Sequence, residues 1–254
     1  MGERTSYAPG TFSWVELQTT DAGGAKAFSG ELFGWEAEDS PAGEAGTYTM
    51  FSKGGRHVAG MFELSDDMRG RGIPPHWGSY VTVADVDASA ARVGELGGTV
   101  VAGPFDVTEA GRMATLQDPQ GAMSLWEPRE HPGAGLVNEP GALCWNDLLT
   151  ADGESSARFY SELFGWRIEP VPGGEYWTIR NGEATNGGIL AIEGMPPVWN
   201  AYFAADGLEA TIGAIERAGR RRADAPARGA GRPLRGRDRP AGSGVLAVRG
   251  RARS

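Results

Sequence analysis

The sequence predicts an α+β protein built from two tandem domains, the second of which is incomplete. The main reason is an internal duplication, because residues 10–41 (GTFSWVELQTTDAGGAKAFSGELFGWEAEDSP) align with residues 141–172 (GALCWNDLLTADGESSARFYSELFGWRIEPVP). A repeat of this length is a domain-sized unit rather than one turn of a solenoid. The second reason is that the correspondence stops at residue 219, where the first copy would continue for three more strands.

The duplication continues beyond the opening segment after small changes in loop length. The matching positions are Trp14 with Trp145, Tyr48 with Tyr176, Gly60 with Gly188, and Pro74-Pro-His-Trp77 with Pro196-Pro-Val-Trp199. The two domains should therefore place equivalent side chains at equivalent points of the fold.

The first copy begins with a βαββ unit. Residues 12–19 alternate apolar and polar side chains as a half-buried strand does. Asp21 then opens a helix with apolar residues on one face, and Gly34 ends it. Residues 48–52 and 57–64 read as two strands around a Gly54-Gly55 turn, since glycine allows the positive backbone angles of a hairpin.

The same order recurs after a proline break. Residues 77–83 read as a strand and residues 86–96 as an Ala-rich helix that stops at a glycine pair. Three strands follow, at residues 99–102, 112–117 and 122–126, and the turn Asp118-Pro-Gln-Gly121 joins the last two. Each domain is thus predicted to contain two similar modules.

We divide the chain into a first domain at residues 8–129, a linker at 130–140, a truncated second domain at 141–219 and an Arg-rich tail at 220–254. The tail holds eleven Arg and two Asp, and it shows neither strand alternation nor helical periodicity. Synonymous codons for residues 233–249, read one base out of frame, can encode RFAVVTDPQGAVFSLFE, which closely matches residues 112–127. We therefore interpret the tail as a frameshift product that is disordered, and not as a nucleic-acid-binding arm.

Composition excludes several classes of protein. The chain of 254 residues is 40% hydrophobic and 22% charged, which is typical of globular domains. The net charge of −9 includes the basic tail, so the remainder is strongly acidic and is not expected to bind nucleic acid. No apolar run is long enough to span a bilayer and no signal pattern opens the chain, so we expect no membrane association and a cytoplasmic location. The lone Cys144 is expected in the core.

Three segments carry a resemblance to a known family. These are TxDxxxAxxFxxxLFGW at residues 19–35, VxDVDAxxARVxELGG at residues 83–98, and GRMATLQDPQGA at residues 111–122 followed by Leu125-Trp126. They resemble the vicinal oxygen chelate superfamily, which includes glyoxalase I, extradiol dioxygenases and bleomycin-resistance proteins, and more narrowly its tandem actinobacterial glyoxalase-like members. The resemblance implies tandem glyoxalase-like domains, each of paired βαβββ modules whose curled mixed sheets enclose a cavity.

The resemblance also implies where a divalent metal would bind, on a His and Glu set from the first and later strands. The first-strand position falls on Trp14, and on Trp145 in the second copy, and an indole cannot ligate a metal. Glu63 remains as a plausible donor and as the candidate catalytic residue. The three histidines, His57, His76 and His131, lie at unrelated positions. We therefore predict no bound metal and no cofactor, with a divalent metal as the alternative.

An aromatic cleft is predicted in place of the metal site. Strand alternation could direct several side chains into the cavity, where flat organic molecules would bind. The predicted ligand-binding residues are Trp14, Tyr48, Met61, Trp77, Tyr80, Arg112 and Trp126. Core packing is the competing interpretation for the aromatic residues, and a solvated ion pair is the competing interpretation for Arg112.

Two functions follow from this pattern. The first is a metal-free protein that sequesters or carries an aromatic or hydrophobic small molecule, as a monomer or weak dimer. The second is a glyoxalase-like lyase or an oxygenase that acts on a small carbonyl compound with a divalent metal. The truncated second domain should leave a bare sheet edge around residues 199–204, which predicts poor solubility.

Overall fold

We describe a computed structural model of the chain over residues 2–43, 46–118, 122–217 and 243–247. The first half forms one eight-stranded sheet with the strand order β2-β3-β4-β1-β5-β8-β7-β6. Its first module contains β1 (Phe12–Thr19), α1 (Ala22–Phe33), β2 (Glu36–Pro41), β3 (Thr47–Lys53) and β4 (Arg56–Glu63). After the short helix α2 (Asp66–Gly70), its second module contains β5 (His76–Thr82), α3 (Val86–Glu95), β6 (Thr99–Val107), β7 (Gly111–Gln117) and β8 (Ala122–Pro128).

The second half forms a six-stranded sheet with the order β10-β11-β12-β9-β13-β14. It contains β9 (Leu143–Thr150), α4 (Gly153–Phe164), β10 (Arg167–Pro170), β11 (Tyr176–Asn181), β12 (Ala184–Ala191), β13 (Val198–Asp206), α5 (Leu208–Arg217) and β14 (Ser243–Ala247). Both sheets are curled and mixed, which confirms the predicted α+β class. In each, the first strand is central and pairs parallel with one neighbour and antiparallel with the other.

Equivalent residues begin and end the equivalent helices. Asp21 accepts a hydrogen bond from the Gly24 amide at 2.8 Å, and Asp152 accepts one from the Ser155 amide at 2.9 Å. These side chains satisfy amides that have no partner inside the helix. Gly34 and Gly165 end α1 and α4 with φ of 69° and 70°, a left-handed conformation that favours glycine.

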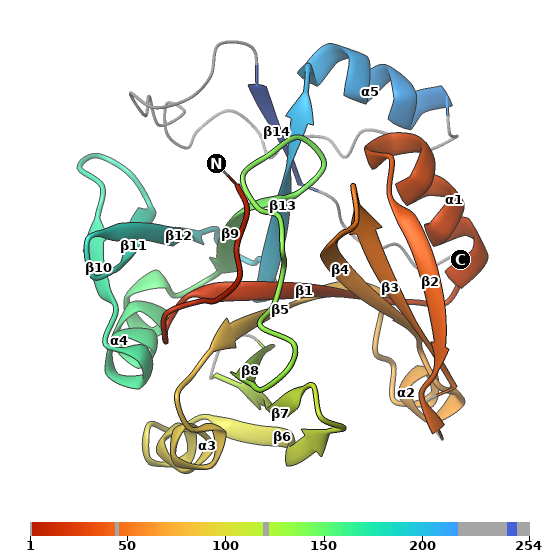
Figure 1. Cartoon of the computed structure of the whole chain (residues 1–254). Coiled ribbons are helices and arrows are strands. Elements are labelled where there is room, and N and C mark those ends of the chain that lie inside the picture. The colour runs from red at the N-terminus through yellow and green to blue at the C-terminus, as the bar shows by residue number, and fades with distance from the viewer. Residues whose placement is uncertain (1, 44–45, 119–121, 218–242, 248–254) are drawn as a thin grey trace.

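The two larger hydrophobic cores are each shared between the two halves of the chain. One core packs β1, β4 and β5 against Phe203 of β13, and the other packs α3, β7 and β8 against α4 and its sheet. Two equivalent tryptophans cross between the halves. The Trp35 indole donates to the Gly141 carbonyl and the Trp166 indole donates to the Gly10 carbonyl, both at 2.7 Å. Figure 1 shows the result, with α1 beside α5 at one end and α3 near α4 at the other.

Three differences from the sequence analysis concern strands. The resemblance implies a third strand in this module, but no residue pattern located β2, because its six residues (EAEDSP) are all exposed and do not alternate. Strand β6 continues past its predicted end at Ala102 to Val107, across a Gly103-Pro104 pair where the register with β7 shifts. Strand β14 lies in the segment predicted to be disordered, and it pairs antiparallel with residues 202–206 of β13.

The pairing of β14 with β13 corrects the expected bare edge, which is covered from Tyr202 to Asp206. The other residues of the tail lie outside the described residues. The interpretation of the tail as a disordered frameshift product therefore stays a prediction for them. The domain boundaries remain a prediction. All strands of the first sheet fall within residues 8–129, although its cores also use side chains from the second half.

Candidate functional site

Four side chains meet on one face of the first sheet, and we call them the first tetrad: Trp14, Glu16, Tyr48 and Tyr80. Trp14 and Glu16 are two residues apart on β1 and so share a face, because side chains alternate along a strand. Tyr80 lies opposite Trp14 on β5, and its hydroxyl donates to Glu16 Oε1 at 2.8 Å. Tyr48, on β3, donates to Glu16 and accepts from the Trp14 indole. The carboxyl group is thus held by two phenols within an aromatic setting.

A glycine makes room for this arrangement. Gly60 of β4 pairs with Glu16, and a Cβ atom at Gly60 would collide with the hydroxyl of Tyr48. Gly188 stands in the same relation to Tyr176 in the second sheet. The glycine therefore lets the tyrosine of the neighbouring strand lie flat over the sheet and reach the carboxylate.

The second sheet repeats the cluster at the duplicated positions, as the second tetrad: Trp145, Asp147, Tyr176 and Tyr202. The Trp145 indole and the Tyr176 hydroxyl both donate to Asp147 Oδ1 at 2.8 Å. Tyr202 forms a further side-chain hydrogen bond to Asp147. Glu16 and Asp147 are equivalent in the duplication, so an acid surrounded by indole and phenol groups has been retained in both copies.

Burial controls the protonation of both tetrads. Burial raises the pKa of Glu16, and the hydrogen bonds from Tyr80 and Tyr48 oppose this shift only in part. Burial likewise raises the pKa of Asp147 against the hydrogen bonds from its three neighbours. The pKa values of Tyr48 and Tyr80 are also raised, first by burial and then by the charge of Glu16. The phenols are therefore neutral hydrogen-bond donors at physiological pH.

The segment that joins the two halves covers the first tetrad. The His131 ring lies edge-on to the Trp14 ring with centroids 4.6 Å apart. The backbone carbonyl of His131 accepts a hydrogen bond from the Trp126 indole. The Ala134 amide donates to the Ser13 carbonyl at 2.8 Å, and Tyr7 donates to the Ala134 carbonyl. As a result Trp14 is 4%, Glu16 7% and Tyr80 6% exposed. Three of the four side chains of the first tetrad are therefore buried, whereas Tyr48 is half-buried.

The second tetrad is more open. Trp145, Tyr176 and Tyr202 are each half-buried, and only Asp147, at 8% exposure, is fully covered. Each aromatic side chain of this cluster is therefore partly exposed to solvent.

The structure brings together four of the residues predicted to bind a ligand. Trp14, Tyr48 and Tyr80 belong to the first tetrad, and the Trp126 ring lies 6.4 Å from the Tyr80 ring. Met61 and Trp77 lie in the core shared with Phe203, on the opposite face of the sheet. Met61 is one residue from Gly60 on β4 and Trp77 is three residues from Tyr80 on β5, and an odd separation places two side chains of a strand on opposite faces of the sheet.

The predicted charged residues lie away from the tetrad. Arg112 pairs with Asp87 at 2.7 Å and with Asp106 at 3.1 Å on the surface. Glu63 is exposed at the end of β4, three residues after Gly60, so alternation turns it to the other face from Glu16. Neither side chain converges with Trp14.

Sequence reasoning did not single out Glu16, Asp147 or Tyr202. One signal was available, since both copies place an acid two residues after the first-strand tryptophan. Burial of this acid could not be read from the pattern, because carboxylates on alternating strands usually face solvent. The contact of His131 with Trp14 was also not predicted, because the two residues are more than 100 positions apart in the sequence.

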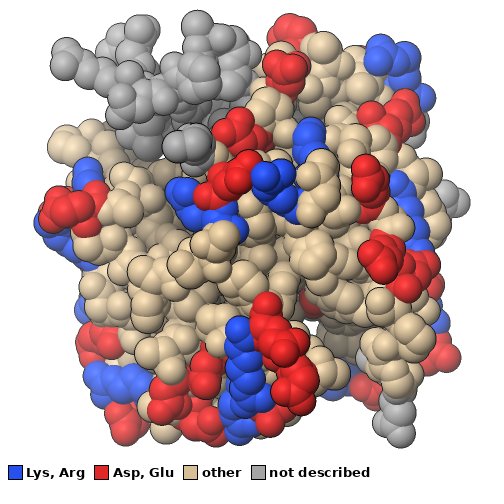
Figure 2. Space-filling view, viewed as in Figure 1, with Lys and Arg blue, Asp and Glu red and all other residues tan. Residues whose placement is uncertain are grey.

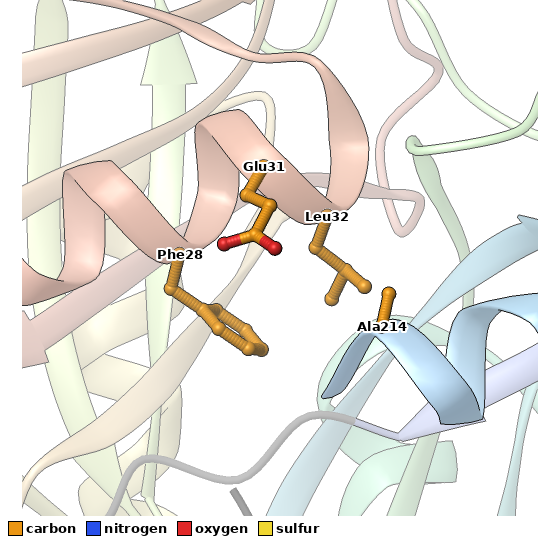
Figure 3. A pocket seen from close by; sticks show the side chains of 4 residues that line it. All are labelled: Phe28, Glu31, Leu32 and Ala214. Carbon is orange, nitrogen blue, oxygen red and sulfur yellow. The ribbon is translucent and has the colours of Figure 1, made fainter. Parts of the chain in front are cut away.

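Two hollows lie outside the tetrads. Figure 3 shows the first, between α1 and α5, where Phe28, Glu31, Leu32 and Ala214 surround a gap too narrow for a water molecule. The second measures about 380 Å³ and is lined by Gly2, Glu3, Lys53, Leu136, Glu139 and Pro140. Neither includes a tetrad side chain.

The donor set around Trp14 does not fit a divalent metal ion. Such an ion needs several oxygen or nitrogen donors that converge on one point, and an indole nitrogen only donates a hydrogen bond. Over the described residues, no three His, Cys, Asp or Glu side chains gather closely enough to hold a metal. Glu16 and Asp147 each stand as a single acid among aromatic groups.

Comparison with known proteins agrees with the fold. Residues 11–124 match the family model of the Glyoxalase/Bleomycin resistance protein/Dioxygenase superfamily. The chain is 39% identical over 226 residues to the Mycobacterium tuberculosis protein named "Putative glyoxylase CFP32", with 86% of each chain covered. It is 32% identical over 227 residues to "Anthracycline biosynthesis protein DnrV" of Streptomyces peucetius, with 82% of each covered.

Solved structures show the same architecture at low identity. The Mn(II)-bound glyoxalase from Novosphingobium aromaticivorans superposes with a TM-score of 0.56 at 17% identity, covering 79% of this chain and 65% of that one. A homoprotocatechuate 2,3-dioxygenase variant from B. fuscum superposes with a TM-score of 0.53 at 14% identity, covering 74% and 56%. The chain thus spans less than two thirds of the length of these solved proteins.

The curled βαβββ sheets and the site on their face define a protein of the vicinal oxygen chelate fold class. With the relatives above, the chain belongs to the glyoxalase/bleomycin resistance/dioxygenase superfamily. This membership confirms the predicted resemblance. Superfamily membership alone does not select a reaction, because one fold carries many functions.

Proposed function

We propose that this protein is a metal-free member of its superfamily that binds an aromatic or hydrophobic small molecule, to sequester or carry it. The observation that carries the proposal is the tetrad. In both copies a tryptophan occupies the position expected for the first metal ligand, and its neighbours are a buried acid and two phenols. Aromatic walls with a few placed polar groups are typical of sites for flat organic ligands.

Two further features support this proposal. The tetrad recurs in both halves, so the chemistry belongs to the ancestral unit of the duplication. The relatives named for anthracycline biosynthesis support an aromatic ligand. The polar groups of each site are neutral phenols, an indole and a single acid, which can hydrogen-bond to an organic ligand but are too few as oxygen donors for a metal ion.

The same proposal covers partners and location. Acidic and basic side chains are interspersed on the face seen in Figure 2, in keeping with a small-molecule ligand rather than nucleic acid as partner. Within the described ranges, no helix has the length and apolar character needed to cross a bilayer. We place the protein in the cytoplasm as a monomer or weak dimer.

The second candidate is a glyoxalase-like lyase or an oxygenase that uses a divalent metal. It is favoured by the relative named as a glyoxylase and by the fold shared with a Mn(II)-bound glyoxalase. Its sequence-based prediction placed Glu63 as the metal donor and proton carrier. Glu63→Gln therefore distinguishes the two candidates.

The test measures metal content and ligand-induced stabilisation on the purified full chain. We expect far less than one metal ion per chain, no change in melting temperature on chelation, and a rise in melting temperature with an anthraquinone. Trp145→Ala should reduce that rise, because the indole forms part of the site, while Glu63→Gln should preserve it. One metal per chain, together with turnover of a methylglyoxal hemithioacetal that Glu63→Gln abolishes, would establish the enzyme instead.

A further inference from the structure

The two tetrads share their chemistry but differ in access. Resting on the proposed function, we propose that the second tetrad is the operative binding site and that its ligand is an organic ammonium ion, a protonated amine attached to a flat apolar body. The first tetrad is then the less exposed, structural copy.

The two tetrads differ in how far their side chains are exposed to solvent. In the first tetrad, both the indole and the carboxyl lie beneath the segment that carries His131 and Ala134. Trp14 and Tyr80 are buried, and only Tyr48 of the aromatic residues in this tetrad is half-buried. In the second tetrad, the equivalent indole and both phenols are half-buried, so each of the three rings is partly exposed to a ligand.

The acid of the second tetrad has no cationic side chain as a partner among the described residues. Asp147 is held by neutral donors, Trp145 and Tyr176 at 2.8 Å and the Tyr202 side chain. Along the described stretches of chain, no Lys or Arg forms an ion pair with Asp147. A buried carboxylate gains more from a cationic partner than from neutral donors alone. A carboxylate offers about four acceptor positions, so a position remains after three donors.

The aromatic rings of the second tetrad also favour a cationic ligand. An ammonium ion is attracted to the faces of Trp and Tyr rings as well as to a carboxylate. Trp145, Tyr176 and Tyr202 provide three such rings around one acid. A carboxylate enclosed by aromatic rings therefore distinguishes an amine from a neutral molecule of the same shape.

The test uses three ligands with the same flat body and different charge: 1-naphthylmethylamine, 1-naphthylmethanol and 1-naphthoate. Binding to the full chain is measured by calorimetry at neutral pH. We expect the ammonium ion to bind at least tenfold more tightly than the alcohol, and the carboxylate to bind most weakly. Equal affinity for the amine and the alcohol would overturn the inference, and this comparison needs no variant.

Two matched variants locate the site. Asp147→Asn should reduce the preference for the amine over the alcohol to about twofold or less, and Glu16→Gln should leave it unchanged. The reverse pattern would place the site at the first tetrad and overturn the inference. If all three naphthyl compounds fail to bind, the proposed function itself fails. If they bind without regard to charge, only the inference fails.

Discussion

Single buried ionisable residues control the chemistry of this molecule, and they respond to burial in opposite directions. Burial raises the pKa of Glu16 and Asp147 because it disfavours the anion. Burial lowers the pKa of His131 to about 4 because it disfavours the cation, with a smaller contribution from His57. His131 Nε2 is buried without a hydrogen-bond partner. The ring is thus held neutral in contact with Trp14 of the first tetrad.

The first prediction at this scale concerns stability against pH. The folded pKa of His131, about 4, lies below its ordinary value of 6.5, so the unfolded chain binds the extra proton between these values. The stability that this residue contributes is present above pH 6.5 and is lost as the pH falls towards 4. His131→Gln should remove roughly 2 kcal/mol of the stability change between about pH 7.5 and about pH 5.

Urea unfolding of both proteins at the two pH values measures this difference. Glu16 and Asp147 contribute with the opposite sign, since their raised pKa values favour the folded state at low pH, but both proteins share that contribution. His76→Gln, in a residue remote from Trp14, is the control and should unfold as the wild type does. Identical pH dependence in all three proteins would show that His131 is not held neutral by burial.

At the scale of elements, the strands decide which residues meet, and glycine makes room at the crossing. Strands β1, β3 and β5 supply the side chains of the first tetrad. Strand β4 lies between β1 and β3, and its Gly60 leaves the space that the hydroxyl of Tyr48 occupies. The same pattern recurs around Gly188. A side chain at either glycine would displace the tyrosine that holds the acid.

We therefore predict that Gly60→Ala lowers the free energy of unfolding by about 1–3 kcal/mol, the usual cost of overpacking a tight interior. Gly23 is the matched control, because it lies within α1 with open space around it. Gly23→Ala should raise stability by about 0.5–1 kcal/mol, since alanine favours the helix. Chemical denaturation of both variants measures the contrast. Equal effects of the two substitutions would mean that Tyr48 has room to move.

At the scale of the whole molecule, the duplication produces two halves that interlock. The tryptophan after the first helix of each half donates to the glycine that precedes the first strand of the other half. Both hydrogen bonds are buried, and both rings belong to cores that combine residues from the two halves. The interface therefore repeats the symmetry of the sequence.

Loss of one such contact should loosen the halves. We predict that Trp166→Phe lowers stability by about 1–3 kcal/mol, because the buried Gly10 carbonyl loses its donor. It should also speed proteolysis within residues 130–140. Trp199→Phe is the control, since it loses a bond of the same kind to Tyr160 within the second half. Cleavage at equal rates in both variants would show that the Trp166 contact does not hold the halves together.

The sequence by itself determined the duplication, the α+β class, most strands and the helix ends, because these depend on local patterns such as alternation, Asp caps and glycine stops. It did not locate β2, whose exposed residues do not alternate, and it did not show that β14 would pair with β13. Alternation along β1 also separates Trp14 and Glu16 from Val15 and Leu17, but it does not say which of the two sets faces a core and which faces a site. Only the tertiary structure decided this, because the cores form between the two halves and the segment carrying His131 packs onto β1. The burial of Glu16 and Asp147 follows from those long-range contacts, and so do their raised pKa values and the difference in access between the two tetrads.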